Sequence, residues 1–251
     1  MDLGLREKSA VVLGGSKGIG RSIALRFAEE GANVAICARG DLALQATESE
    51  LRQKKVQVCA RVCDVGKPDA LRAFLETARR ELGSVEVLVN NATAFAFSDD
   101  EEGWQASLNV DLMGAVRASN IVTPWMTAGG GGAIVHISSL SGMEAGSPPA
   151  YAAAKAALIS HSKNLARTLA PHGVRVNAVA PGSIEFPNGL WDEIKRTNRP
   201  LYDSALATSP WGRMGAPDEV ADAVVFLASP RAAWITGVCL AVDGGQHKGN
   251  L

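Results

Sequence analysis

Short apolar runs alternate with amphipathic stretches along most of the chain, and this alternation is what most limits the folds available to it. Runs such as Ala10–Leu13 and Ala133–Ser138 are largely apolar, as expected of strands buried on both faces. Strands that alternate with helices indicate βαβ units. Because such crossovers are right-handed, they predict a parallel sheet with helices on both faces.

We expect about seven strands, near residues 10–13, 34–37, 56–62, 85–90, 133–138, 174–180 and 238–242. The connecting helices should lie near residues 21–30, 42–54, 69–82, 104–127, 150–170 and 218–228. The sequence shows no repeat, low-complexity tail or linker. We therefore predict one α/β domain over residues 1–251, built on a doubly wound, Rossmann-like parallel sheet.

Residues 182–217 break this alternation. We predict an irregular insertion here, which carries several aromatic side chains: Phe186, Trp191, Tyr202 and Trp211. A long insertion in a compact fold is usually functional or disordered. One interpretation is a substrate loop that closes an apolar lid over the site. The other is that these aromatics pack against the core or a neighbouring subunit.

A glycine-rich turn follows the first predicted strand. Ser9–Leu13 leads into Gly14-Gly-Ser-Lys-Gly-Ile-Gly20, and an amphipathic helix comes next. Glycines let the backbone approach a pyrophosphate, and a helix N-terminus offers free N–H groups with a partial positive charge. The spacing differs from the G-x-G-x-x-G of longer dehydrogenases. The context predicts a dinucleotide site, although a plain tight turn is the alternative.

Tyr151 and Lys155 lie four residues apart in a predicted helix, and Ser138 ends a predicted strand thirteen residues before the tyrosine. Residues i and i+4 share a helix face, so a phenol and an ammonium should point the same way. A nearby cation favours the phenolate, which suits a tyrosine for acid–base work. The serine can hydrogen-bond the same substrate oxygen. Two solvated helix residues are the alternative for the pair taken alone.

Charge and composition exclude several classes of function. A net charge of −1 provides no basic field for a nucleic acid backbone. No apolar run approaches the ~20 residues that a membrane span needs, and the first residues lack the pattern of a signal peptide. The four cysteines form no C-x-x-C pair and no zinc spacing. We predict a cytoplasmic protein with no metal, no membrane contact and no nucleic acid partner.

Together these motifs resemble the short-chain dehydrogenase/reductase family over essentially the whole chain, and in particular members like the 3-oxoacyl-(acyl carrier protein) reductases. The matching positions occur in the family's order: Gly14, Gly18, Ile19 and Gly20; Asp64-Val65; Asn90-Asn91-Ala92; Ser138, Tyr151 and Lys155; Pro181-Gly182; and Val242–Gly245. The chain departs from the pattern at Leu13, Thr93 and Phe186, where the family carries Thr, Gly and Thr.

The resemblance implies hydride transfer between a nicotinamide and a carbonyl or secondary alcohol, without a metal. Tyr151 would move the proton, Lys155 would assist it and bind the nicotinamide ribose, and Ser138 would orient the substrate oxygen. The implied cofactor site consists of Gly14, Ser16, Lys17, Gly18, Ile19, Gly20, Arg39, Asp64, Val65, Asn91, Ala92, Pro181, Gly182 and Ile184, together with Tyr151 and Lys155.

The end of the second predicted strand indicates which nicotinamide cofactor to expect. An NAD site usually places an acidic residue there to accept from the ribose 2′-hydroxyl. This chain has Ala38 and then Arg39, and Arg39 can pair with a 2′-phosphate. Lys17 in the glycine turn can add a second cation. We predict NADP(H) over NAD(H), although both residues are also plausible as solvated surface cations.

Asp111 stands where the family commonly carries an asparagine that holds a water in a proton relay through the lysine. An ionised aspartate accepts hydrogen bonds but cannot donate them. It can pair with Lys155, or hold a proton itself if it is buried. Asn109, two positions earlier, should point off another side of the helix. We include Asp111 among the catalytic residues and expect activity to survive with an altered pH profile.

Substrate and assembly are less constrained. Phe95, Phe97, Met143 and Glu144 are expected to line the site, and they favour an apolar or cyclic carbonyl compound or a 3-oxoacyl thioester. The alternatives are an NAD-dependent alcohol or diol dehydrogenase, and a non-catalytic cofactor-binding scaffold on the same fold. The resemblance implies a homotetramer or homodimer that packs through the helices near 104–127 and 150–170.

Overall fold

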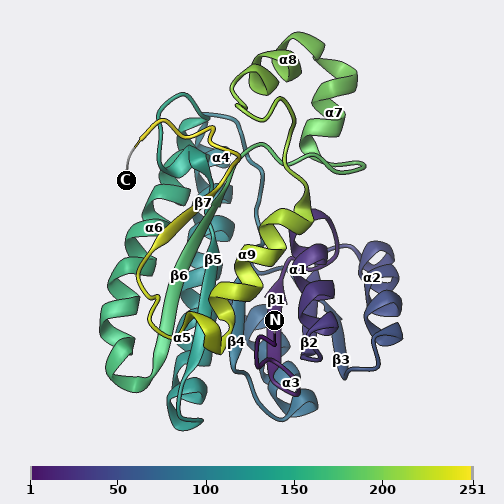
Figure 1. Cartoon of the computed structure of the whole chain (residues 1–251), viewed down its shortest axis with the longest axis vertical. Helices are drawn as coiled ribbons and strands as arrows, with labels where there is room; N and C mark the ends of the chain where they lie inside the picture. The colour runs from purple at the N-terminus through teal and green to yellow at the C-terminus, as the bar shows by residue number, and fades with distance from the viewer. Residues whose placement is uncertain (1, 250–251) are drawn as a thin grey trace.

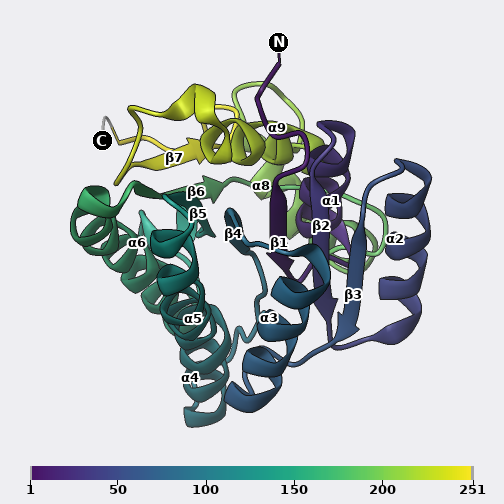
Figure 2. The same cartoon turned by 90° about the horizontal axis from the view of Figure 1, so that it is seen from below.

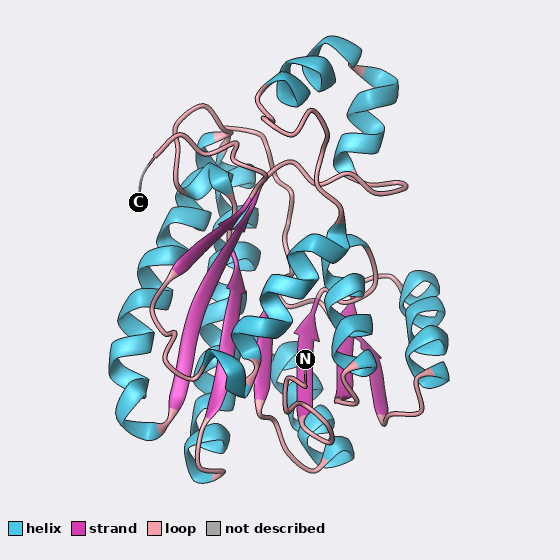
Figure 3. Cartoon of the chain, viewed as in Figure 1, coloured by secondary structure: helices cyan, strands magenta, loops and turns pink. Residues whose placement is uncertain are grey.

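One sheet of seven parallel strands forms the centre of the computed structural model, which describes residues 2–249 (Figures 1 and 3). The strand order is β3-β2-β1-β4-β5-β6-β7. The strands are β1 Ser9–Leu13, β2 Asn33–Ala38, β3 Val58–Val62, β4 Val87–Asn90, β5 Gly132–Ile137, β6 Val174–Pro181 and β7 Cys239–Val242. This confirms the predicted doubly wound, Rossmann-like α/β fold.

Helices cover both faces of the sheet, as Figure 2 shows from below. One face packs against α1 Gly18–Glu29, α2 Asp41–Gln53 and α9 Pro217–Ala228. The other packs against α3 Pro68–Leu82, α5 Gly114–Ala128 and α6 Pro149–Leu169. The strands feed both cores because successive side chains point to opposite faces: Val12 lies in the first core and Val11 in the second.

The predicted helix over 104–127 is not a single regular helix. It consists of α4 Glu101–Ser107, a π-helical turn at Leu108–Met113 and then α5. Asp100 caps α4 by accepting a hydrogen bond from the Gly103 amide at 2.8 Å. A π-turn changes the direction of the side chains that follow it and is common at functional sites. Here it contains Asp111.

The prediction that residues 182–217 are irregular was wrong for much of the segment, because α7 Leu190–Thr197 and α8 Arg199–Ala207 lie within it. In α7, acidic residues occupy the first turn and basic residues the last, which complements the helix dipole. In α8, the Asn198 side chain accepts from the Leu201 amide, and a proline stands in the first turn. Figure 1 shows both helices beyond the carboxyl ends of the strands.

The sheet has a topological switch between β1 and β4. From β1 the chain proceeds to β2 on one side, whereas β4 and β5 continue on the other. Ligands of open α/β sheets bind at such a crevice, outside the carboxyl ends of the strands. Predicted site residues follow the ends of β1 to β6, so the fold brings them to the same edge.

Candidate active site

Tyr151 and Lys155 both lie in the first two turns of α6, which Pro149 opens at a position where a missing N–H costs nothing. The Lys155 ammonium lies 5.5 Å from the centre of the Tyr151 ring. The two side chains therefore share one helix face, as their spacing predicts.

Lys155 is buried, with 2% of its surface exposed. Its Nζ donates to the Ile137 carbonyl oxygen at 3.0 Å and lies 3.1 Å from Oδ1 of Asp111, which is itself 1% exposed. The second contact is an ion pair rather than a well-aligned hydrogen bond. An ammonium this deep in a protein needs a counter-charge, and Asp111 is that partner.

The π-turn separates Asp111 from its neighbour Asn109. Asn109 donates to the Gly66 carbonyl oxygen at 3.0 Å and accepts from Arg117 at 2.8 Å. It thus points away from Lys155, as expected from its position, and takes no part in the lysine contact. Of the alternatives for Asp111, the structure shows the pairing with Lys155. Because Asp111 acts on the site through the lysine, it is a positioning residue.

Ser138 comes directly after β5 and is buried. Its hydroxyl donates to the Lys155 backbone carbonyl at 3.0 Å, and its amide donates to Val179 on β6 at 2.7 Å. These bonds fix the serine between β5, β6 and α6. The structure thus brings Ser138, Tyr151 and Lys155 to one place at the carboxyl edge of the sheet.

The glycine turn packs closely against the loop that follows β4. A Cβ atom on Gly20 would stand 2.1 Å from the Gly14 carbonyl oxygen, and one on Gly14 would stand 2.9 Å from the Ala92 Cα. Asn91 donates from its side chain to the Gly14 carbonyl at 2.9 Å. Only glycine fits such approaches, so Gly14, Gly20, Asn91 and Ala92 form one unit.

The first turn of α1 also fits a pyrophosphate. Lys17 stands at the N-cap without a side-chain cap, and no acidic residue occupies the first turn. Gly18 and Ile19 begin the helix, and the Ser16 carbonyl accepts from Thr47 on α2 at 3.1 Å. Free helical N–H groups without competing carboxylates suit an anion. The residues of the turn therefore fit the pyrophosphate of a dinucleotide.

Two cations stand near the end of β2 and the glycine turn. Lys17 and Arg39 are both exposed, and within residues 2–249 neither forms an ion pair. The two cations are therefore available to an external phosphate.

Farther along the same edge, Oδ1 of Asp64 accepts from the Gly66 amide at 3.0 Å, and Val65 is buried in the second core.

The loop after β6 holds the remaining predicted cofactor residues. Pro181 ends β6, the Gly182 amide donates to Val242 on β7 at 3.1 Å, and Ile184 is buried in the first core. Phe186 lies against the glycine turn, since a Cβ on Gly18 would come within 2.4 Å of its ring. Of the two interpretations of this segment, the structure shows Phe186 packed against the first core, and its contact with the glycine turn is one that no sequence pattern indicated.

Tyr202 and Trp211, two other aromatics of the 182–217 segment, differ in how far they are buried. Tyr202 is buried, and its hydroxyl donates to Glu185 at 2.6 Å. Trp211 is 70% exposed and stacks near Arg213, whose guanidinium lies 5.3 Å from its ring. Packing within the segment therefore accounts for Tyr202, whereas the Trp211 ring is largely open to solvent in this chain.

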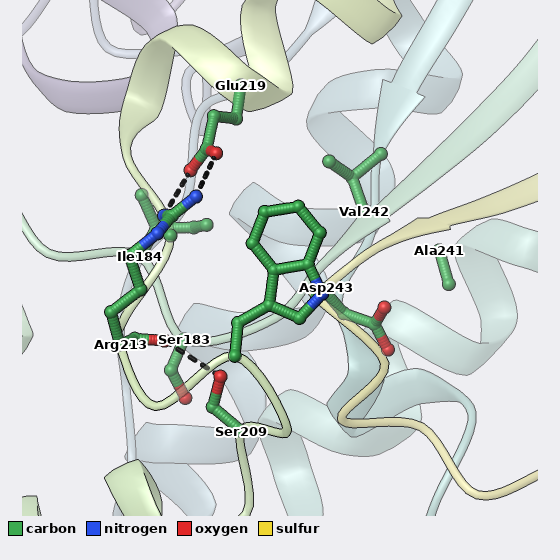
Figure 4. Close-up of a pocket in the computed structure, with 11 residues that line it drawn as sticks. Ser183, Ile184, Ser209, Arg213, Glu219, Ala241, Val242 and Asp243 are labelled. Atoms are coloured by element: carbon green, nitrogen blue, oxygen red, sulfur yellow. Dashed lines mark hydrogen bonds and ion pairs between the residues drawn. The ribbon is translucent and has the colours of Figure 1, made fainter.

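A separate pocket of about 260 Å³ lies between the loop after β6, the loop before α9 and the end of β7 (Figure 4). Ile184, Trp211 and Val242 line it, and the Arg213–Glu219 ion pair borders it. None of Ser138, Tyr151 and Lys155 lines this pocket. It is therefore not the place where those three side chains meet.

Aromatic rings stand beside the tyrosine. The Phe95 ring is stacked on Tyr151 with centroids 6.3 Å apart and an angle of 19°, and the Phe97 ring meets Tyr151 edge-on at 5.6 Å. Phe95 and Phe97 are 52% and 38% exposed. An apolar surface thus adjoins the phenol, as expected from the sequence.

The C-terminal segment reaches the loop after β5. Glu144 accepts from the Lys248 amide at 3.0 Å and from His247 Nδ1 at 2.5 Å. The Lys248 amide first, and then His247, hold the pKa of Glu144 below its usual value. More than a hundred residues separate these partners, so no sequence pattern reveals the contact.

Comparison with known proteins gives the family. A family model described as enoyl-(acyl carrier protein) reductase matches residues 14–247, which is most of the chain. The chain is 39% identical over 249 residues to a 3-oxoacyl-(acyl carrier protein) reductase of Chlamydia trachomatis, covering 96% of this chain and 98% of that one.

The chain is a short-chain dehydrogenase/reductase. The chain is also 32% identical to isoepoxydon dehydrogenase of Penicillium expansum, covering 98% of this chain and 97% of that one. The structure of L-sorbose reductase from Gluconobacter frateurii, complexed with NADPH and L-sorbose, superimposes with a TM-score of 0.91 at 35% identity, covering 99% of this chain and all of that one. The family's oxidoreductases use a nicotinamide cofactor.

The helices and the potential metal-ligating side chains of residues 2–249 bear on membranes and metals. No helix there is long and apolar enough to cross a membrane. No group of three or more His, Cys, Asp or Glu side chains in that part of the chain is arranged to hold a metal ion.

Proposed function

We propose that this enzyme reduces a carbonyl compound to a secondary alcohol with NADPH, and that its substrate is apolar or cyclic or is a 3-oxoacyl thioester. The observation that carries the proposal is the convergence of Tyr151, Lys155 and Ser138 at the edge of the sheet. Membership of an oxidoreductase family supports it.

The three side chains have distinct tasks. Tyr151 donates its phenolic proton to the substrate oxygen during reduction and removes it during oxidation. The Lys155 ammonium, fixed by Ile137 and Asp111, stabilises the phenolate that remains. Ser138 releases the Lys155 carbonyl and donates to the same substrate oxygen, which stabilises the charge that develops there.

The cofactor supplies the hydride when bound. The turn from Gly14 to Gly20 would hold its pyrophosphate, through Ser16, Lys17, Gly18 and Ile19, and Lys155 and Tyr151 would meet the nicotinamide ribose. Asp64 and Val65 would contact the adenine, and Asn91 and Ala92 would lie beside the ribose. Pro181, Gly182 and Ile184 would contact the nicotinamide.

NADP(H) is the proposed form of the cofactor. Arg39 and Lys17 are exposed and free of ion pairs within the described residues, and no carboxylate follows β2 until Asp41. A guanidinium pairs strongly with a phosphate. NADPH in the structure of L-sorbose reductase, a relative over its whole length, supports this choice.

One relative and one pair of side chains bear on the substrate. The 3-oxoacyl-(acyl carrier protein) reductase supports an acyl thioester, whereas Phe95 and Phe97 beside Tyr151 favour a flat apolar group. We retain the 182–217 segment, with α7 and α8, as the substrate-binding part of a single domain. A homotetramer or homodimer in the cytoplasm remains a prediction from the resemblance.

Titration of the purified protein with NADPH and NADH, followed by nicotinamide fluorescence, tests the proposal first. We expect NADPH to bind at least ten times more tightly. Reduction of ketones, quinones and 3-oxoacyl thioesters is then measured with wild type and with Tyr151→Phe. Tighter NADH binding would favour the alternative, an NAD-dependent alcohol or diol dehydrogenase. Turnover by Tyr151→Phe equal to wild type would contradict the acid–base assignment, and cofactor binding without any turnover would favour a scaffold.

A further inference from the structure

The loop after β4 contains a strained residue beside the phenol. Phe95 has a φ of +49°, in the left-handed region that non-glycine residues seldom occupy. Such a conformation persists only where the surroundings hold it. The contacts of this loop should therefore show what fixes the Phe95 ring.

Two side chains hold the backbone around Phe95. Thr93 Oγ1 accepts from the Phe95 amide at 3.2 Å, and Asp111 Oδ2 accepts from the Ala94 amide at 3.0 Å. The other oxygen of Asp111 is the one paired with Lys155. A single buried carboxylate therefore connects the lysine of the active site with the turn that presents Phe95.

Both of these side chains occur where the sequence departs from the family pattern. Thr93 replaces the glycine that ends the Asn-Asn-Ala-Gly motif, and Asp111 replaces the usual asparagine. A glycine has no hydroxyl to offer the Phe95 amide. An asparagine has one carboxamide oxygen, so it can accept from Ala94 or from Lys155 but not from both through separate oxygens. The two departures thus act on the same turn.

The consequence is an ordered aromatic corner. Phe95 lies along Tyr151, Phe97 stands edge-on to it, and the two phenylalanine rings meet edge-on at 5.8 Å. Their exposed fractions leave ring surface available for a ligand. Aromatic rings prefer offset-stacked or edge-on partners, so this corner suits a planar ring better than a flexible chain.

We propose that Thr93 and Asp111 are positioning residues that hold Phe95 as one wall of the substrate site, and that this wall selects a carbonyl group borne on or beside a planar ring. The inference rests on the proposed function, because it places the substrate at Tyr151. Of the two substrate classes in the proposed function, the inference favours the ring compound over the acyl thioester.

The test measures binding apart from turnover. Calorimetry gives the dissociation constants of 1-naphthol, a planar ring, and 1-octanol, a flexible chain, for the protein saturated with NADPH. We expect 1-naphthol to bind wild type more tightly than 1-octanol. Phe95→Leu should weaken 1-naphthol binding roughly three- to tenfold, since an aromatic pair contributes about 0.5–1.5 kcal/mol beyond its area. The affinity for 1-octanol should stay the same.

A matched pair of variants tests the role of Thr93. Thr93→Val keeps the shape and loses the hydroxyl, whereas Thr93→Ser keeps the hydroxyl. We expect Thr93→Val to weaken 1-naphthol binding roughly threefold or more, as loss of one hydrogen bond does, and Thr93→Ser to restore it. Phe226→Leu on α9, where the ring is 37% exposed, should bind both ligands like wild type.

The outcomes separate the two proposals. Equal binding of 1-naphthol by wild type, Phe95→Leu and Thr93→Val overturns the inference, as does preference for 1-octanol. Parallel losses for both ligands also overturn it, because the wall would then lack selectivity for rings. Ring-selective binding without reduction of any ketone contradicts the proposed function but still supports Phe95 as a wall of the binding site.

Discussion

Asp111 Oδ1 lies 3.1 Å from Nζ of Lys155, and both side chains are buried. The pair joins the π-turn before α5 to the helix that carries Tyr151. Breaking one partner of a buried ion pair leaves an uncompensated charge, whereas replacing both by apolar groups is often neutral or stabilising.

Asp111→Leu should lower the free energy of unfolding by about 3–5 kcal/mol, because it leaves Lys155 buried without a counter-charge. The double variant Asp111→Leu/Lys155→Met should recover most of that loss while remaining inactive. Urea unfolding of wild type, Asp111→Leu, Lys155→Met and the double variant measures the changes in stability. If the two single losses simply add in the double variant, the two residues are not coupled.

Arg39→Ser should weaken NADPH binding roughly 10- to 150-fold, since a hydrogen-bonded charge contributes about 1.5–3 kcal/mol. Binding of NADH should change little, because NADH has no 2′-phosphate. Fluorescence titration checks both constants. Arg72→Ser on α3, another exposed arginine, is the control, and an equal loss for both cofactors would argue against phosphate recognition.

His136 should make the fold less stable in acid. Burial first, then His161 and Lys155, lower its pKa from 6.5 to about 3. Between pH 6.5 and about 3, His136 is therefore protonated in the unfolded chain and neutral in the folded chain. Its effect on stability is absent above pH 6.5 and grows as the pH falls towards 3, by up to about 1.4 kcal/mol per pH unit.

The measurement is urea unfolding from pH 7.5 to 4.5 for wild type, His136→Asn and His172→Asn. His136→Asn should flatten the loss of stability with falling pH, whatever it does at pH 7.5. His172 is exposed, so its variant should follow the wild-type curve. Parallel curves for all three proteins would show that His136 does not govern the acid response.

Tyr202→Phe should loosen α7 and α8 without affecting the sheet. The Tyr202 hydroxyl donates to Glu185, which also accepts from Lys195 at 2.7 Å. Loss of a hydrogen bond to a charged group should speed amide exchange in both helices by roughly ten- to a hundredfold. Hydrogen exchange read by mass spectrometry should show no change in β4 and β5. Equal protection of α7 and α8 in both proteins would mean that this bond does not hold the segment.

The sequence predicted the parts of the fold that follow local rules. Apolar runs gave the seven strands to within a few residues, and the Tyr151–Lys155 spacing placed both side chains on one helix face. The helices α7 and α8 escaped prediction because residues 182–217 break the strand–helix alternation, although the charges of α7 follow the helix dipole. The π-turn escaped because residues 104–127 have the pattern of one continuous helix.

By itself the sequence determined the strand–helix order, the glycine turn and the residues that resemble a reductase site, because periodicity and motif spacing act within a few residues. Only the tertiary structure decided that Asp111 pairs with Lys155, that Thr93 and Asp111 fix Phe95, that Phe186 covers Gly18, and that His247 reaches Glu144. These contacts join residues brought together by the sheet. Their partners depend on how helices and loops pack across it, and no local pattern encodes that.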